Sequence, residues 1–186
     1  MTRIIAGKAR GRRLAGPKGS NTRPTSDRVR EALFSSLTSA LGSLEGLRFL
    51  DLYAGTGAVG LEAWSRGAGV VGFVESDRSA AALIAANAKA IGFQRPQLHT
   101  ATVGRVLDTP PGAPFDVVFA DPPYDVPSAD VDAVLDALIG HGWVSEGGLV
   151  IVERSVRVPA PLWPVGLEPT STKKYGETVL HTATTA

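Results

Sequence analysis

The segment Asp121-Pro122-Pro123-Tyr124 holds the residues of this 186-residue chain that are best suited to chemistry. The carboxylate of Asp121 and the backbone carbonyl of Pro122 can both accept hydrogen bonds from one amino group. Two successive prolines fix φ and stiffen the backbone, and the ring of Tyr124 can stack on a flat heterocycle. We therefore predict that this segment holds an exocyclic amine and directs its nitrogen towards an electrophilic methyl group. A rigid turn with a packed tyrosine is the alternative.

A second candidate site is the glycine-rich segment Gly55-Thr56-Gly57-Ala58-Val59-Gly60. It matches the pattern G-x-G-x-x-G, in which glycines let a ligand approach the backbone at a helix N-terminus. Glu75 follows 20 residues after Gly55, and a carboxylate at this spacing can accept hydrogen bonds from both hydroxyls of a ribose. The glycines alone would also suit a tight turn, but together with Glu75 they predict a nucleoside-containing cofactor.

Asp51 indicates which cofactor this is, because it stands four residues before Gly55. A carboxylate so close to the glycines disfavours the pyrophosphate of a dinucleotide and favours a cationic group. S-adenosyl-L-methionine carries a ribose, an adenine, an ammonium and a sulfonium, and it has no phosphate. Asp51 and Glu75 together therefore predict S-adenosylmethionine rather than NAD. N-capping of the following turn is the alternative role of Asp51.

The positive charge of the chain is concentrated at its N-terminus. Residues 1–30 carry nine basic residues and one acidic residue, a net charge of +8, whereas the other 156 residues carry ten basic and 17 acidic ones, a net charge of −7. Apolar residues on both sides of a glycine-containing turn predict a small β-hairpin here. A basic arm on an acidic body favours a nucleic acid partner; a merely solvated arm is the alternative. The arm cations are Arg3, Lys8, Arg10, Arg12 and Arg13.

Composition excludes several other kinds of site. The chain has no cysteine, and its three histidines are far apart in sequence, so we expect no disulfide, no thiol nucleophile and no metal site. No apolar run reaches the roughly 18 residues that a membrane span needs. We therefore expect a cytoplasmic protein that acts without a membrane.

The elements that would position these residues alternate between strands and helices. Nearly continuous apolar strands between helices indicate a parallel sheet that is buried on both faces. The helix that begins near Thr25-Ser26-Asp27 should end before Gly42. Further helices are expected at 58–66, 79–90 and 130–139, and strands at 49–53, 70–75, 97–100, 115–120 and 148–153, with weaker candidates near 167 and at 178–182. Both candidate segments then follow strands and lie at the carboxyl edge of one sheet.

These motifs together resemble a known group of enzymes. The segment from Asp51 to Gly57, Glu75 and Asp121-Pro122-Pro123-Tyr124 are similar to class I S-adenosylmethionine-dependent methyltransferases that modify exocyclic amines. Residues 23–34, preceded by residues 4–14, resemble more narrowly the RsmD family of small-subunit ribosomal RNA guanine-N2 methyltransferases. Residues 173–178 match as well, so the resemblance runs from Arg3 to about Leu180.

The resemblance implies a Rossmann-like α/β fold with a seven-stranded, mostly parallel sheet, an antiparallel last hairpin and helices on both faces. It implies a division into a basic β-hairpin arm at 1–20 and a methyltransferase domain at 21–186. The implied substrate is guanine 966 of 16S rRNA, expected within a small-subunit assembly particle, and the enzyme is expected to be a monomer.

The resemblance also assigns roles to single residues. Asp121, Pro122 and Tyr124 would be catalytic, and Lys173 and Lys174 would hold rRNA together with the arm. Ala101 stands where the family often has Asn or Asp to meet adenine, so backbone N–H groups or Thr102 would take that role. The residues expected to bind the cofactor are Arg23, Thr25, Asp51, Tyr53, Gly55, Gly57, Glu75 and Thr102.

Two other functions stay open. A DNA adenine-N6 methyltransferase would share the Asp-Pro-Pro-Tyr segment, although such enzymes usually carry an added target-recognition domain, for which 186 residues leave little room. A non-catalytic RNA-binding assembly factor on the same fold is the alternative from another class, and failure to bind S-adenosylmethionine would favour it.

Overall fold

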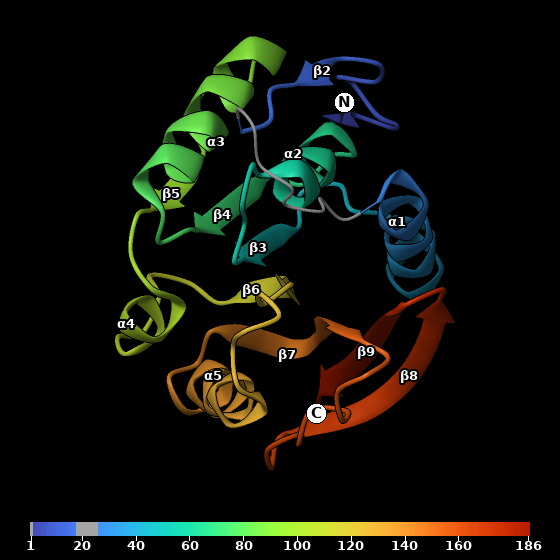
Figure 1. Cartoon of the computed structure of the whole chain (residues 1–186), viewed down its shortest axis with the longest axis vertical. Helices are drawn as coiled ribbons and strands as arrows, with labels where there is room; N and C mark the ends of the chain where they lie inside the picture. The colour runs from blue at the N-terminus through green and yellow to red at the C-terminus, as the bar shows by residue number, and fades with distance from the viewer. Residues whose placement is uncertain (1, 18–25) are drawn as a thin grey trace.

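The core of the structure is one seven-stranded sheet in the order β5-β4-β3-β6-β7-β9-β8 (Figure 1). The computed structural model describes residues 2–17 and 26–186. Strands β3 to β7 are paired in parallel, and β9 runs antiparallel between β7 and β8. The predicted sheet with its antiparallel last hairpin is thus confirmed. The strands are β3 (Arg48–Leu52), β4 (Val70–Val74), β5 (Gln97–His99), β6 (Phe115–Ala120), β7 (Val144–Ser155), β8 (Leu167–Tyr175) and β9 (Thr178–Thr185).

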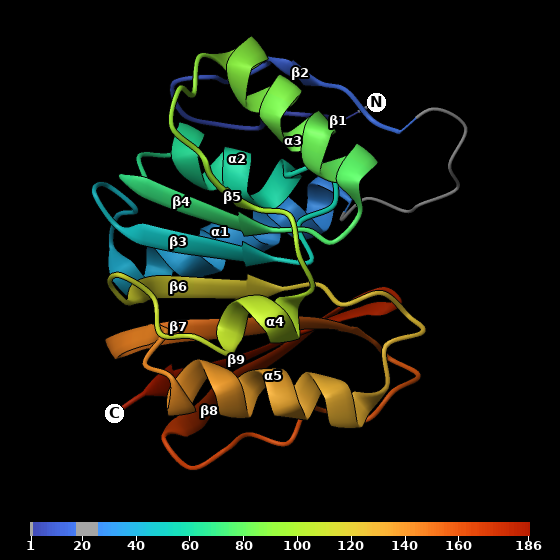
Figure 2. The same cartoon turned by 90° about the vertical axis from the view of Figure 1, so that its left-hand side faces the viewer.

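Helices cover both faces of the sheet, as predicted (Figures 1 and 2). Helices α1 (Asp27–Leu41), α2 (Ala58–Ser65) and α3 (Arg78–Ile91) pack on one face, and α4 (Val103–Leu107) and α5 (Ser128–Gly140) pack on the other. Successive strand residues alternate between the two apolar layers: Phe49 packs in the first layer and Leu50 in the second. This is why the strands read as continuous apolar runs in the sequence.

The helix and strand boundaries follow the sequence signals closely. Ser26 is the N-cap of α1, where its hydroxyl accepts a hydrogen bond from Val29 N at 3.2 Å. Gly57 precedes α2 with a φ of 81°, a left-handed conformation that favours glycine. Helix α4 was not predicted, because five residues are too few for a periodic apolar pattern. Strand β7 is longer than the predicted 148–153, because it begins at Val144, passes through Gly147 and continues to Ser155.

The N-terminal arm is a small antiparallel hairpin, as predicted. Its strands β1 (Thr2–Arg3) and β2 (Arg13–Leu14) form a separate two-stranded sheet. Ile4 and Leu14 are buried and belong to the same apolar layer as α1, α2 and α3. The arm therefore adds to the core of the rest of the chain. The predicted boundary between the two domains, at residue 20, lies outside the described residues, and the division itself stays a prediction.

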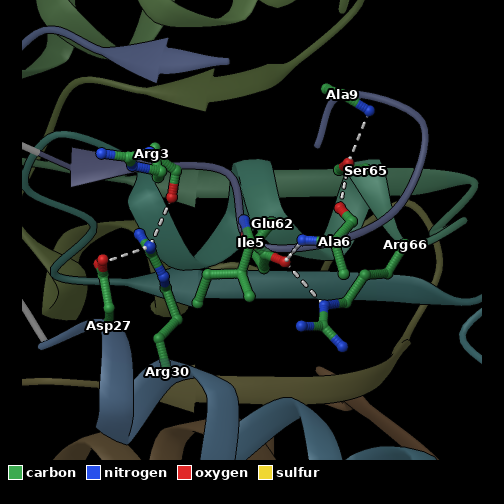
Figure 3. Close-up of polar contacts among 9 residues, drawn as sticks. All are labelled: Arg3, Ile5, Ala6, Ala9, Asp27, Arg30, Glu62, Ser65 and Arg66. Atoms are coloured by element: carbon green, nitrogen blue, oxygen red, sulfur yellow. Dashed lines mark hydrogen bonds and ion pairs between the residues drawn. The ribbon is translucent and has the colours of Figure 1, made fainter. Parts of the chain in front are cut away.

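Helix α2 holds the arm with polar contacts as well (Figure 3). The buried carboxylate of Glu62 accepts hydrogen bonds from the backbone N–H groups of Ile5, at 2.7 Å, and Ala6, at 2.9 Å. The hydroxyl of Ser65 accepts one from Ala9 N and donates one to Ala6 O. A side chain on Gly7 would overlap the backbone at Ser65. The close approach of arm and helix therefore needs glycine at this position.

Within the described part of the chain, no helix is both long and apolar enough to cross a lipid bilayer.

Candidate active site

A cleft of about 1220 Å³ opens at the carboxyl edge of the parallel strands. Residues at or just after the carboxyl ends of β3, β4, β6 and β7 line it, because parallel strands bring these ends to one edge of the sheet. The first turn of α1, helices α4 and α5, and the turn between β8 and β9 complete the wall. Predicted site residues that line this one cleft are Tyr53, Gly55, Glu75, Thr102, Asp121, Pro122 and Tyr124.

A hydrogen bond connects the glycine loop to Glu75. The carboxylate of Glu75 accepts hydrogen bonds from Gly55 N through Oε2 and from Asp77 N through Oε1, both at 2.8 Å. A carboxylate has acceptor positions to spare after two such bonds. Glu75 is therefore held in the cleft wall, ready to accept further hydrogen bonds from hydroxyl groups of a ligand.

Tyr53 has the only positive φ among the non-glycine residues that the structure describes, at 57°. Such a conformation is uncommon for a bulky residue, and it often occurs where a functional site constrains the backbone. Burial raises the pKa of the Tyr53 hydroxyl, as does the negative charge of Asp130, while Arg154 acts in the opposite direction. The hydroxyl of Tyr53 therefore stays neutral and can both donate and accept hydrogen bonds in the cleft.

Asp51 lies behind the cleft wall instead of in it. Its side chain is among the buried polar groups, with 2% exposure, and its Oδ2 accepts a hydrogen bond from Gly60 N at 2.8 Å. Gly60 N belongs to the first turn of α2, so the contact matches the alternative role, a cap of the turn that follows the strand. Burial raises the pKa of Asp51 well above its usual value, and the nearby charges of Asp121 and Glu75 raise it further. A direct contact of Asp51 with a cofactor stays a prediction.

The remaining predicted cofactor residues lie at the starts of two helices or outside the described residues. Gly57 is buried at the start of α2 and is not part of the cleft wall. Thr102 is the N-cap of α4, where its hydroxyl accepts from Arg105 N at 3.4 Å. Arg23 and Thr25 lie outside the described residues. Their neighbours in sequence, Ser26 and Arg28, line the cleft.

The Asp-Pro-Pro-Tyr segment forms a rigid part of the cleft wall. Pro122 is buried, whereas Tyr124 is 76% exposed, the only strongly exposed aromatic ring among the described residues. Val126 N donates a hydrogen bond to Pro123 O at 3.0 Å, which closes the turn after the two prolines. An exposed ring on a stiff backbone is available for stacking against an incoming flat molecule.

The charge of the cleft is strongly negative. Among the described lining residues, Arg28 is the single base. Such a lining attracts cationic and hydrogen-bond-donating groups and repels phosphates. The acidic lining residues are Glu75, Asp108, Asp121, Asp130, Glu153 and Glu177.

The predicted RNA-binding residues lie in two separate regions. Lys173 and Lys174 are exposed on β8, which leads into the cleft-lining turn at Tyr175–Thr178, and Lys173 Nζ donates to Ser36 Oγ on α1 at 3.1 Å. The tip of the arm lies at the carboxyl ends of α2 and α3, which is the edge of the sheet away from the cleft (Figure 2).

Two cations of the arm tip have partners within the chain. Lys8 Nζ lies 4.0 Å from the ring centre of Trp64, and Arg12 Nη2 donates to Ala90 O at 2.6 Å, near the end of α3. Positive charge at helix carboxyl ends is favourable because the helix dipole is negative there. Arg3, Arg10 and Arg13 are exposed and remain open to an outside partner.

Sequence reasoning missed several residues of the cleft, including Asp130, Glu153 and the turn at Tyr175–Thr178. Glu153 could have been found, since it ends an apolar stretch whose carboxyl end must lie beside those of its parallel neighbours. The turn carries no local signal for its place at the cleft, because a long-range pairing of β9 with β7 brings it there.

Comparison with known proteins gives a consistent set of relatives. Residues 2–184 match the family model described as conserved hypothetical protein 95. The chain is 33% identical over 162 residues to ribosomal RNA small subunit methyltransferase D of Escherichia coli K12. The aligned region covers 87% of this chain and 79% of the relative. The protein of the same name from Haemophilus influenzae is 36% identical over 154 residues, or 81% and 77% of the two chains.

Solved structures agree with the fold. The Escherichia coli protein yhhF superposes with a TM-score of 0.86 at 28% identity, covering 98% of this chain and 97% of that one. A hypothetical protein of Thermus thermophilus superposes with a TM-score of 0.78 at 32% identity, covering 98% of each chain.

Proposed function

This chain belongs to the RsmD family, whose family model is described as conserved hypothetical protein 95, and on this basis we propose that it methylates small-subunit ribosomal RNA. The proposed target is the exocyclic N2 amine of guanine 966 in 16S rRNA, and the proposed methyl donor is S-adenosyl-L-methionine. We further infer that the protein acts as a monomer on a small-subunit assembly particle in the cytoplasm, where ribosomal subunits are made.

The observation that carries this proposal is a single acidic cleft that contains both the glycine loop with Glu75 and the Asp-Pro-Pro-Tyr segment. The residues present fit S-adenosylmethionine, because its sulfonium and ammonium are cations and it has no phosphate for the acidic lining to repel. Glu75, Gly55, Tyr53 and Thr102 are the described residues that would hold it. When bound, it supplies an electrophilic methyl group.

The residues of the chain position the amine and take up its proton. Asp121 and the Pro122 carbonyl would accept hydrogen bonds from the two N–H groups of the amine, which leaves the nitrogen lone pair free to react. Tyr124 would stack on the base once it has turned out of its own stack. Asp121 would receive the proton that the amine loses. Positioning and charge placement would supply most of the rate.

The rRNA backbone would be held outside the cleft. Lys173 and Lys174 are exposed on β8, which leads into the cleft-lining turn, and the exposed arginines of the arm would provide a second group of cations. Phosphates are kept out of the cleft by its own charge, so the backbone would run along these cations while one base enters.

The experiment that tests this function compares two carboxylate variants. Asp121→Ala should bind S-adenosylmethionine with an affinity close to wild type, because Glu75 and the glycine loop are intact. Its methyl transfer to small-subunit particles lacking the modification should fall by at least about a hundredfold. Calorimetry measures the first quantity, and mass spectrometry of the rRNA measures the second and identifies the modified base.

Asp125→Ala is the matched control, since this exposed carboxylate follows Tyr124 but does not line the cleft. It should behave like wild type. Full activity of Asp121→Ala would remove Asp121 from the mechanism. A wild-type protein that binds no S-adenosylmethionine would favour an assembly factor, and methylation of duplex DNA in preference to rRNA would favour a DNA adenine-N6 methyltransferase.

A further inference from the structure

Glu153 lies at the carboxyl end of β7, next to the Asp-Pro-Pro-Tyr segment. Val152 is in register with Ala120 on the neighbouring parallel strand β6, and Glu153 follows Val152 as Asp121 follows Ala120. The side chain of Glu153 is buried to 9% exposure. It lines both the main cleft and a small adjoining hollow, whose wall also contains Asp121, Pro122 and Tyr124.

The register also determines the face on which Glu153 lies. Phe119 and Ile151 pack in the apolar layer of α1, whereas Ala120 and Val152 pack in the opposite layer. Side chains alternate along a strand, so Glu153, which is still part of β7, returns to the face of Ile151. Asp121 follows the last residue of β6 and lines the same hollow as Glu153. Neighbouring strands are about 4.8 Å apart. Glu153 and Asp121 therefore follow paired positions of two neighbouring strands and line the same part of the cleft, where the target amine would be held.

Guanine and adenine differ at the ring position beside this amine. Guanine N1 carries a hydrogen and donates, and it is adjacent to the N2 amine, whereas adenine N1 is a bare acceptor. We propose that Glu153 accepts the hydrogen bond from guanine N1–H and so selects guanine as the base that enters the cleft. This inference rests on the proposed function and adds the residue that determines its specificity.

The chemistry of a carboxylate suits this role. Its two oxygens offer about four acceptor positions, so contacts within the protein leave capacity for a ligand. With adenine, a buried carboxylate would face an acceptor, and both groups would lose their hydrogen bonds to water without replacement. The backbone of Glu153 is paired with Leu180 of β9. A strand between two paired neighbours holds a specificity residue more rigidly than a loop would.

The test replaces the target guanine by 2-aminopurine, which keeps the 2-amino group but has a bare acceptor at N1. Small-subunit particles carrying either base at the target position are methylated under identical conditions, and kcat/KM is compared. Wild-type protein should prefer guanine by at least about tenfold. Glu153→Gln should lower that preference by at least about tenfold, because the glutamine amide can donate a hydrogen bond to the bare N1.

Glu168→Gln is the control for this variant, because Glu168 is an exposed carboxylate on β8 outside the cleft. It should keep the wild-type preference. Binding of S-adenosylmethionine by Glu153→Gln, measured by calorimetry, reports whether the variant is folded. If it is not folded, Glu153→Met, which is similar in size and has no amide, is measured in its place, and the preference should again fall.

Each outcome is decisive for the inference. Equal kcat/KM of the wild-type protein for guanine and 2-aminopurine overturns the role of Glu153 while leaving guanine methylation intact. An unchanged preference in a folded Glu153 variant overturns it as well. A wild-type protein that fails to methylate the guanine particle contradicts the proposed function itself, so the two failures are distinguishable.

Discussion

Asp51 is a buried carboxylate that accepts a hydrogen bond from Gly60 N beneath the cleft. Its raised pKa means that the folded protein holds the proton of Asp51 at pH values where the unfolded chain has lost it. The contribution of this group to stability is therefore complete below the ordinary value of 3.8 and declines as the pH rises towards the pKa of the folded state.

Replacing this carboxylate tests its protonation directly. Asp51→Asn keeps an oxygen that can accept from Gly60 N but cannot ionise. The free energy of unfolding of the variant minus that of the wild type should therefore increase as the pH is raised from about 4 to about 8, because only the wild type loses the contribution of a protonated Asp51. Urea unfolding of both proteins across this range measures the difference. A difference that does not change with pH would show that burial has not shifted the pKa of Asp51.

Gly60 is required by packing, because a Cβ at this position would overlap the ring of Phe73 on β4. Gly60→Ala should therefore lower the free energy of unfolding by about 1–3 kcal/mol. Gly140 ends α5, and apart from its chain neighbours and the backbone of its own helix, no described atom lies within 4 Å of where its Cβ would be. Gly140→Ala should be neutral or stabilising by up to about 1 kcal/mol. Thermal or urea unfolding compares the two, and equal effects would argue against close packing of α2 on β4.

At the scale of secondary-structure elements, the buried carboxylate of Glu62 is a main polar contact between the arm and helix α2. Glu62 accepts from two backbone N–H groups of the arm and from Arg66 Nε, at 2.7 Å, on its own helix (Figure 3). Its side chain is fully buried. Because an unsatisfied buried donor is costly, losing this acceptor should release the arm from the helix.

Glu62→Gln puts an amide donor where two donors already point, so it should destabilise the protein by about 1–3 kcal/mol. Hydrogen exchange of residues 2–15 should become faster than in wild type, while exchange in β6 changes less, because the arm opens locally. Glu31→Gln, on the exposed surface of α1, is the control. Unchanged exchange in the arm would mean that apolar contacts of Ile4 and Leu14 suffice to hold it.

Across the molecule as a whole, the proposed RNA-binding cations lie towards opposite edges of the sheet. Lys173 and Lys174 are close to the cleft, whereas Arg10 lies at the arm tip, where the chain contacts the carboxyl ends of α2 and α3. An RNA that contacts both groups must extend along the side of the protein. The size of the RNA should therefore decide which cations contribute to binding.

Salt dependence of binding separates the two groups. Changing Lys173 and Lys174 to Gln should reduce the slope of log K against log salt by up to about 1.4 on both a short RNA hairpin and a complete subunit particle, at about 0.7 for each phosphate contact. Changing Lys8 and Arg10, both at the arm tip, to Gln should reduce the slope only on the particle. Equal effects of the two pairs on the short hairpin would contradict an RNA path that starts at the cleft.

Features that depend on neighbouring residues could be predicted from the sequence. Apolar runs such as residues 115–120, separated by helical patterns, specify a parallel sheet buried on both faces, because only such a sheet buries consecutive apolar side chains. The caps at Ser26 and Gly57 are equally local, since each depends on a few residues of backbone. The common location of Glu75 and Asp121 followed from the same rule, because parallel strands end at one edge.

Which distant groups meet could be learned only from the folded chain. The partner of Asp51, the seating of the arm on Glu62, and the place of Glu153 beside Asp121 all depend on contacts between segments far apart in the chain. No local pattern encodes these contacts, because they follow from strand order, register and the packing of helices on the sheet. Short motifs thus predicted the chemistry of the cleft. The negative charge of the cleft and its proposed selectivity for guanine depend on residues that only the folded sheet brings together.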